Sequence, residues 1–246
     1  MINKFKSLTK FFEENSHRSH SQGLQDLFVI FFLNYVGKAG YFVEIGAADG
    51  KHFSNTLLLE RIGWKGILVD PVDYGSSDLI RNSIKDKRCV YSESGLKLKF
   101  KEQKLKFKEQ SKFEAPLDPK GPQTKEFSGL YNHLSDYAKN LTAGLTYEVE
   151  TVSLNDLLEE HGAPTKIDYI SIDTEGSEFE IIKNFNFSKY NVEIFTIEHN
   201  SASYREDIIK LLESKKYYRI PPGHFSPGFE DWYIKKDNPV LKKLAV

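Results

Sequence analysis

An apolar segment that ends in a glycine-containing turn is the feature that most constrains the fold of this chain. Residues 41–50 read Tyr-Phe-Val-Glu-Ile-Gly-Ala-Ala-Asp-Gly, so the pattern Glu44-x-Gly46-x-x-x-Gly50 closes the segment. Gly46 permits a tight turn and Gly50 lets the backbone approach a ligand, whereas a side chain at either position would block this. A helix-like run over residues 54–61 follows at once. The pattern predicts a nucleotide-binding strand-turn-helix unit.

The spacing of these glycines differs from that of dinucleotide-binding proteins. Their Gly-x-Gly-x-x-Gly fingerprint would need a glycine at position 48, where this chain has Ala48. A second short apolar segment, residues 66–70, ends in Asp70, about twenty residues beyond Gly50. A carboxylate at that place can hold the hydroxyls of a ribose.

A third sequence segment and several smaller motifs together resemble those of a known protein family. Residues 167–172 read as a buried strand that opens into Asp173-x-Glu175-Gly176-x-Glu178. The other motifs are Ser21-Gln22-x-x-Gln25-Asp26, Val43-Glu-Ile-Gly-Ala, Ser54-Asn55-Thr56, Gly63-Trp64-Lys-Gly66 and Val152-Ser-Leu-Asn-Asp-Leu-Leu. With these motifs the chain resembles the FkbM family of S-adenosylmethionine-dependent methyltransferases over roughly residues 21–110 and 147–235.

The resemblance implies a cofactor, S-adenosylmethionine, and a place for it. Glu44 and Gly46 would lie near its amino-acid end, and Asp70 would accept from its ribose hydroxyls. The turn also exposes N–H groups at a helix N-terminus, which favours an anionic group such as the methionine carboxylate. Ser54 or Asn55 could cap that helix and touch the carboxylate. The expected cofactor-binding residues are Glu44, Gly46, Ala47, Asp49, Gly50, Ser54, Asn55, Asp70, Pro71 and Ser92, with Ser92 and Glu93 flanking the adenine.

Methyl transfer to a hydroxyl also requires a group that aligns the acceptor and removes its proton. Ligands of open α/β sheets bind at the carboxyl ends of the strands, where polar residues follow the fourth and fifth strands. We expect Asp173 or Glu175 to act as the base or as an acceptor ligand, with His199 as the second candidate. Glu198 and Asn200 leave the same strand as His199.

Two simpler interpretations of these side chains stay open. Glu178 could merely complement the dipole of the helix that it begins. Asp, Glu and His side chains at adjacent strand ends could also bind magnesium or a similar hard cation, although we favour a site without metal.

The acceptor class follows from the resemblance and from charge. The resemblance suggests O-methylation of a sugar or another hydroxylated small molecule; the alternative is a binding or regulatory module that keeps the fold without turnover. The chain has 34 basic and 35 acidic residues, so no overall field draws it to nucleic acid or to an anionic membrane. Methylation of RNA or protein is also disfavoured because no Asn-Pro-Pro-Tyr-type motif follows the fourth strand.

Composition further predicts a cytoplasmic protein. No apolar run approaches the length of a membrane span, and the N-terminus lacks the apolar core of a signal peptide. The single cysteine, Cys89, excludes an intramolecular disulfide and is expected to be a buried strand thiol. The oligomeric state is left open.

Strand-like and helix-like segments alternate along the chain, which predicts an α/β fold with a Rossmann-like class I methyltransferase architecture. We expect a mostly parallel seven-stranded sheet with helices on both faces and an antiparallel C-terminal hairpin. Residues 1–246 would form one domain, with an N-terminal helical segment over residues 1–36. The expected strands are 41–45, 66–70, 88–92, 167–172, 192–198, 217–220 and 231–235, and the expected helices are 2–14, 22–36, 54–62, 76–84, 153–161, 177–184 and 203–215.

Residues 93–146 depart from this alternation and are expected to be an accessory insertion. The heptapeptide Lys-Leu-Lys-Phe-Lys-Glu-Gln occupies residues 97–103 and is repeated without change at residues 104–110. Leu98 and Phe100 share one face of a strand but no face of a helix, so each copy is read as a half-exposed strand in a hairpin or edge extension, kept soluble by lysine. Binding of an acidic substrate or of nucleic acid by these lysines is the less favoured alternative. The irregular residues 111–144 predict a substrate lid, under which His52 and His133 could line the site.

Overall fold

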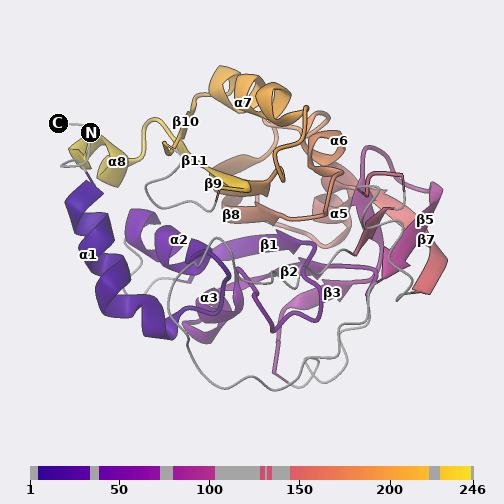
Figure 1. Ribbon diagram of the computed structural model, residues 1–246, viewed down its shortest axis with the longest axis horizontal. Helices are drawn as coiled ribbons and strands as arrows, with labels where there is room; N and C mark the ends of the chain where they lie inside the picture. The colour runs from indigo at the N-terminus through magenta and orange to yellow at the C-terminus, as the bar shows by residue number, and fades with distance from the viewer. Residues whose placement is uncertain are drawn as a thin grey trace.

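A seven-stranded sheet forms the centre of the computed structural model, which describes residues 5–33, 39–72, 80–102, 128–130, 132–134, 145–221 and 228–244 (Figure 1). Its strands are β1 (Tyr41–Ile45), β2 (Lys65–Val69), β3 (Ile84–Asp86), β8 (Lys166–Ile172), β9 (Asn191–Glu198), β10 (Tyr217–Arg219) and β11 (Glu230–Lys235). Their order is β10-β11-β9-β8-β1-β2-β3. Neighbours from β9 to β3 are parallel, whereas β11 is antiparallel to both β9 and β10.

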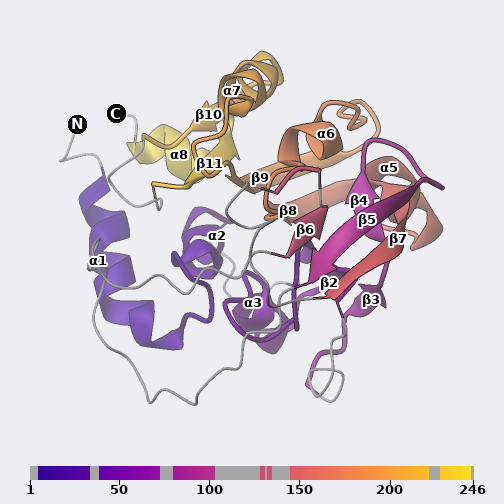
Figure 2. The same cartoon turned by 45° about the vertical axis from the view of Figure 1, so that its right-hand side comes forward.

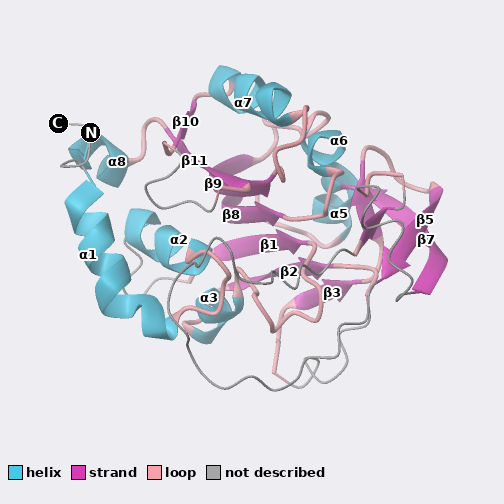
Figure 3. Cartoon of the chain, viewed as in Figure 1, coloured by secondary structure: helices cyan, strands magenta, loops and turns pink. Residues whose placement is uncertain are grey.

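Helices cover both faces of this sheet (Figure 3). Because side chains alternate between the faces of a strand, Val43 and Ile45 of β1 belong to one apolar core and Phe42 to the other. The first core is shared with α5 (Leu154–Glu160), α6 (Glu178–Ile182) and α7 (Arg205–Ser214), and the second with α1 (Lys6–Asn15), α2 (Gln25–Leu33), α3 (Leu57–Arg61) and α8 (Pro239–Leu244). No helix within the described ranges is long and apolar enough to cross a membrane.

A second, four-stranded sheet packs beside the first (Figure 2). It has the order β4-β7-β5-β6 and contains β4 (Cys89–Tyr91), β7 (Leu145–Ser153), β5 (Lys97–Glu102) and β6 (Gly129–Leu130). Its small core contains Cys89, Phe100, Leu130 and Val149. Cys89 is therefore a buried strand thiol, as the sequence predicts, and burial raises its pKa to about 12.

The region around residues 80–92 differs from the expectation. The expected third strand, residues 88–92, forms β4 of the second sheet and pairs with β7, while β3 takes its place at the edge of the first sheet. The expected helix over residues 76–84 is not formed in its described part. Residues 80–83 are irregular, and β3 begins at Ile84. The reason is a set of contacts with Glu60, whose carboxylate accepts from Arg81 Nε at 2.6 Å and Ser83 Oγ at 2.6 Å.

The first heptapeptide copy forms β5, so the prediction of a strand is correct for that copy. It does not lie at a sheet edge, because β7 and β6 flank it on its two sides. Phe100 is buried and Leu98 packs against the same small core. The second copy, residues 104–110, lies outside the described residues. The strand β7, which pairs along the whole of β5, was not expected.

We expect deletion of one heptapeptide copy to leave the fold and cofactor affinity nearly intact. Deleting either copy gives the same sequence, so the remaining copy can form β5 with its full register to β7. Shortening the following connection by one heptapeptide should change the free energy of unfolding by less than about 1 kcal/mol. Urea unfolding of the variant and the parent protein provides the comparison, and a large loss of stability would show that both copies belong to the core.

Candidate functional site

The carboxyl ends of four adjacent parallel strands, β9, β8, β1 and β2, meet at one edge of the larger sheet, where ligands of such sheets bind. A pocket opens at this edge, between the two sheets. Gly46, Asp70, Pro71 and Asp173 line it from the ends of β1, β2 and β8. The second sheet contributes apolar walls, namely Cys89, Val90, Phe100 and Leu130.

Gly46 allows the ends of β1 and β8 to approach each other closely. Its φ is +82°, and a Cβ atom at this position would lie 1.6 Å from the backbone oxygen of Asp173. Any other residue would therefore separate the two strand ends. Gly50 also has a positive φ, +71°, in the turn that follows. The turn is as tight as the sequence predicts, and it brings Asp173 beside the glycine.

Glu44 lies beneath this turn and is only 3% exposed. Its carboxylate accepts from Ser54 Oγ at 2.9 Å, from Asn55 N at 2.6 Å and from Thr56 Oγ1. Burial raises its pKa. These hydrogen bonds stabilise the turn from its buried side. None of Glu44, Ser54 and Asn55 lines the pocket.

Arg81 is a site residue that the sequence did not indicate. Its buried guanidinium donates to Gly50 O at 2.5 Å, Ser54 Oγ at 3.0 Å and Thr56 Oγ1 at 2.9 Å. Arg81 therefore stabilises the turn although it lies 31 residues beyond Gly50 in the sequence. No local pattern could have revealed this, because Arg81 lies in a stretch that resembles a helix in the sequence.

Asp70 connects the ends of β1 and β2. Its Oδ2 accepts from Ala48 N and its Oδ1 from Val72 N, both at 2.9 Å. Burial raises the pKa of Asp70 to about 6. Since each carboxylate oxygen can accept two hydrogen bonds, Asp70 keeps acceptor capacity towards the pocket that it lines.

The remaining expected cofactor residues, Ala47, Asp49, Gly50 and Ser92, are not among those that line the pocket. Ala47 is buried in the core shared with α2. Asp49 accepts from the backbone N–H groups of Lys51 and His52, both at 2.8 Å, and its other oxygen lies 2.5 Å from His52 Nδ1. Ser92 follows β4, and its carbonyl accepts from Asn184 Nδ2 at 3.4 Å.

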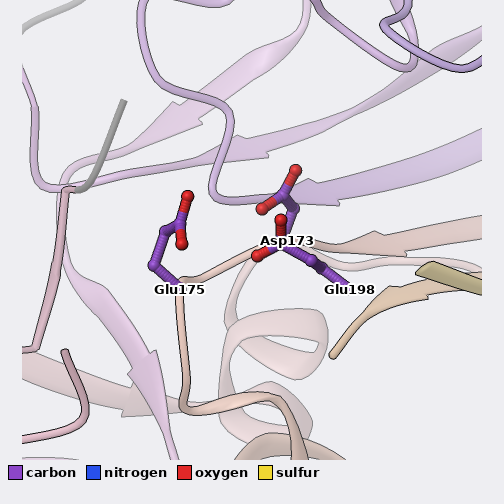
Figure 4. Close-up of side chains that lie close together, drawn as sticks. All are labelled: Asp173, Glu175 and Glu198. Carbon is purple, nitrogen blue, oxygen red and sulfur yellow. The ribbon is translucent and has the colours of Figure 1, made fainter. Parts of the chain in front are cut away.

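Three carboxylates gather where β8 and β9 end (Figure 4). Asp173, Glu175 and Glu198 each place an oxygen within 4.8 Å of the others. Desolvation raises the pKa of Asp173 to about 6. Burial, Asp173 and Glu175 hold the pKa of Glu198 well above its ordinary value. The structure thus brings together the two expected catalytic carboxylates, Asp173 and Glu175. Glu198 joins them because β8 and β9 are parallel neighbours, so that their carboxyl ends are adjacent.

Glu178 and Asn200 shape the segment that carries these carboxylates. Glu178 Oε1 accepts from Thr174 N and Gly176 N, both at 3.0 Å, and Tyr204 OH donates to its Oε2 at 2.6 Å. Glu178 therefore has a structural role at the start of α6. Asn200 Nδ2 donates to Glu175 Oε2 at 3.0 Å.

His199 lies outside this carboxylate cluster. Its Nδ1 accepts from Ser201 N at 3.0 Å, and its Nε2 lies 3.7 Å from Asp231 Oδ2. The ring is only 2% exposed, and desolvation lowers its pKa. Asp231 is in turn held by Arg205 Nε at 2.8 Å. His199 therefore does not join the other two expected catalytic residues, Asp173 and Glu175, which lie in the cluster.

The described part of the predicted lid, residues 128–130 and 132–134, packs against the loop after β8. A Cβ atom on Gly129 would lie 2.9 Å from Thr174 O, and one on Gly176 would lie 2.6 Å from His133 O. His133 Nε2 lies 3.1 Å from Tyr91 OH, which ties this segment to the second sheet. Ser128 and Leu130 of this segment line the pocket, while most of the predicted lid lies outside the described residues.

A comparison with protein families decides the membership of this chain. The model described as "Methyltransferase FkbM domain" matches residues 44–220, well over half of the 246 residues. The chain belongs to the FkbM methyltransferase family. The match runs from Glu44 through the cluster and into the C-terminal hairpin, so it includes every pocket-lining strand end described above. Searches of the curated proteins and of the solved structures found no match.

Proposed function

We propose that this FkbM methyltransferase transfers a methyl group from S-adenosylmethionine to a hydroxyl of a sugar or another hydroxylated small molecule. The observation that carries this proposal is the juxtaposition of the Gly46 turn, Asp70 and Asp173 around one pocket. We interpret the larger sheet as a Rossmann-like class I methyltransferase fold, because four parallel pairs are extended by one antiparallel strand, β11, that lies between β9 and β10.

The residues around the pocket fit an adenosyl cofactor. Asp70 has unused acceptor capacity for ribose hydroxyls, and Gly46 presents backbone without a side chain. The apolar walls from Val90 and Phe100 suit an adenine ring. When bound, S-adenosylmethionine supplies an electrophilic methyl group on a sulfonium.

The carboxylates supply the acceptor side of the reaction. A base works best when its pKa lies near the working pH, and the pKa of Asp173 is raised to about 6. Asp173 can therefore accept a hydroxyl proton near neutral pH, and Glu175 of the same cluster can help to bind the acceptor. The same carboxylates would repel phosphate groups, so we favour an uncharged, hydroxyl-bearing small molecule over nucleic acid.

The pH dependence of cofactor binding tests the role of Asp70. Ionised Asp70 accepts hydroxyl donors better than its protonated form does, so ribose binding should release the proton that Asp70 holds below about pH 6. Affinity should therefore rise as the pH increases from 5 to about 6 and level off above that value. Fluorescence titration with S-adenosylhomocysteine at several pH values measures this. The variant Asp70→Asn should lose the rise, and an identical rise in both proteins would contradict the assignment.

A further inference from the structure

The carboxylate cluster places three acidic side chains next to one another, of which Glu198 is buried and Asp173 and Glu175 are partly buried. Among the strongest electrostatic influences on Asp173 are Glu178, Glu44 and Asp70, and all of these are acidic. For Glu198 they are Asp173, Glu175 and Glu178, which are acidic as well. Buried carboxylates are normally paired with cations or coordinate metals, because their desolvation is costly. A base alone does not require three converging carboxylates.

Glu198 provides an independent observation that points to a ligand at this cluster. The residue is only 7% exposed, and its Oε2 is buried without a hydrogen-bond partner among the described residues. Its carboxylate points towards Asp173 (Figure 4). Beside the cluster, the amide of Asn200 is fixed by its bond to Glu175, and its Oδ1 is likewise buried without a partner in the described part of the chain. Buried polar atoms of this kind are rare and call for an explanation.

We propose that Asp173, Glu175 and Glu198 bind a divalent cation that prefers oxygen ligands, such as Mg²⁺ or Mn²⁺. Carboxylate oxygens suit these hard ions, and Asn200 Oδ1 could add a neutral oxygen ligand. When the metal–oxygen bonds are about 2.1 Å long, ligand oxygens on such an ion lie about 3 Å apart if adjacent and about 4 Å apart if opposite. The three carboxylate oxygens, which all lie within 4.8 Å of one another, therefore have to approach through side-chain movements.

This cation would deepen the proposed function, on which its role in the reaction rests. A hydroxyl bound to the cation has a lowered pKa and a fixed position, so it loses its proton to water more readily. The new bond from that oxygen to the methyl carbon forms as the bond from the methyl carbon to sulfur breaks, and no redox partner is needed. Asp173 and Glu175 would then act on the acceptor through the cation.

Calorimetric titration of chelator-treated protein with MnCl₂, without cofactor or acceptor, tests the site. We expect one saturable site in the parent protein. Glu198→Gln and Asp173→Asn should each weaken it by roughly tenfold or more. Glu159→Gln is the matched control, because Glu159 is an exposed carboxylate that pairs with Lys189 at 2.8 Å, and it should bind Mn²⁺ like the parent.

Thermal unfolding shows whether a weakened variant is still folded. Mn²⁺ should raise the unfolding midpoint of the parent protein and leave that of Glu198→Gln unchanged. Without metal, Glu198→Gln should unfold at the same temperature as the parent or higher, since it removes a repelled carboxylate. No saturable binding by the parent, or equal binding by Glu198→Gln, would overturn the proposal. Metal binding without any binding of S-adenosylmethionine would instead contradict the proposed function and leave the metal site intact.

Discussion

Replacing Asp173 with asparagine should lower methyl transfer by roughly a hundredfold or more while changing cofactor affinity little. Asparagine keeps the shape of the side chain but removes the negative charge that takes part in proton removal or cation binding. The backbone oxygen of Asp173, which lies against Gly46, is retained in the variant. The measurement is the initial rate of transfer from radiolabelled S-adenosylmethionine to an acceptor that supports turnover in the parent protein.

The control for this variant is Asp207→Asn, because Asp207 is an exposed aspartate in the first turn of α7, away from the pocket lining. It should retain the parent rate. Glu175→Gln should follow Asp173→Asn, since Glu175 belongs to the same cluster. Full activity of both cluster variants would remove these carboxylates from the reaction, and a chelator-sensitive rate in the parent protein would support their role as metal ligands.

Replacing Asp70 with alanine should weaken cofactor binding by roughly ten- to a hundredfold. Loss of a charged hydrogen-bond partner typically costs about 1.5–3 kcal/mol, which corresponds to this loss of affinity. Equilibrium dialysis with radiolabelled S-adenosylmethionine measures the effect. Asp70→Ala also removes the acceptor for Ala48 N and Val72 N, so the unfolding midpoint must be compared in parallel. A folded variant with the parent affinity would show that Asp70 does not contact the cofactor.

The central strands could be predicted because their sequences carry strong local signals. Segments rich in apolar residues that end at glycine or acidic residues mark β1, β2 and β8, and these strands are buried on both faces. The strands β3 and β4 have only three residues each, and charged residues lie among or beside them. Such short segments carry little periodicity, and their sheet membership depends on pairing with β2 and β7, which are distant in sequence.

The site could be predicted in its residue types but not in its contacts. Position at a strand end was enough to find Asp70, Asp173 and Glu175. The sequence does not indicate that Arg81 donates to Gly50 O or that Ser201 N donates to His199 Nδ1. Both contacts depend on the path of the folded backbone. The sequence likewise does not indicate that the Glu44 carboxylate turns inward, where it accepts from Ser54, Asn55 and Thr56.

Calorimetric titration of the parent protein with S-adenosylmethionine tests the central claim most directly. The FkbM family match, the Gly46 turn and the acceptor capacity of Asp70 together predict one site with a dissociation constant in the micromolar range. S-adenosylhomocysteine should compete for that site, because it shares the ribose and the methionine carboxylate. Absence of saturable binding by folded parent protein, both with and without added Mg²⁺, would contradict the proposal that this chain uses S-adenosylmethionine.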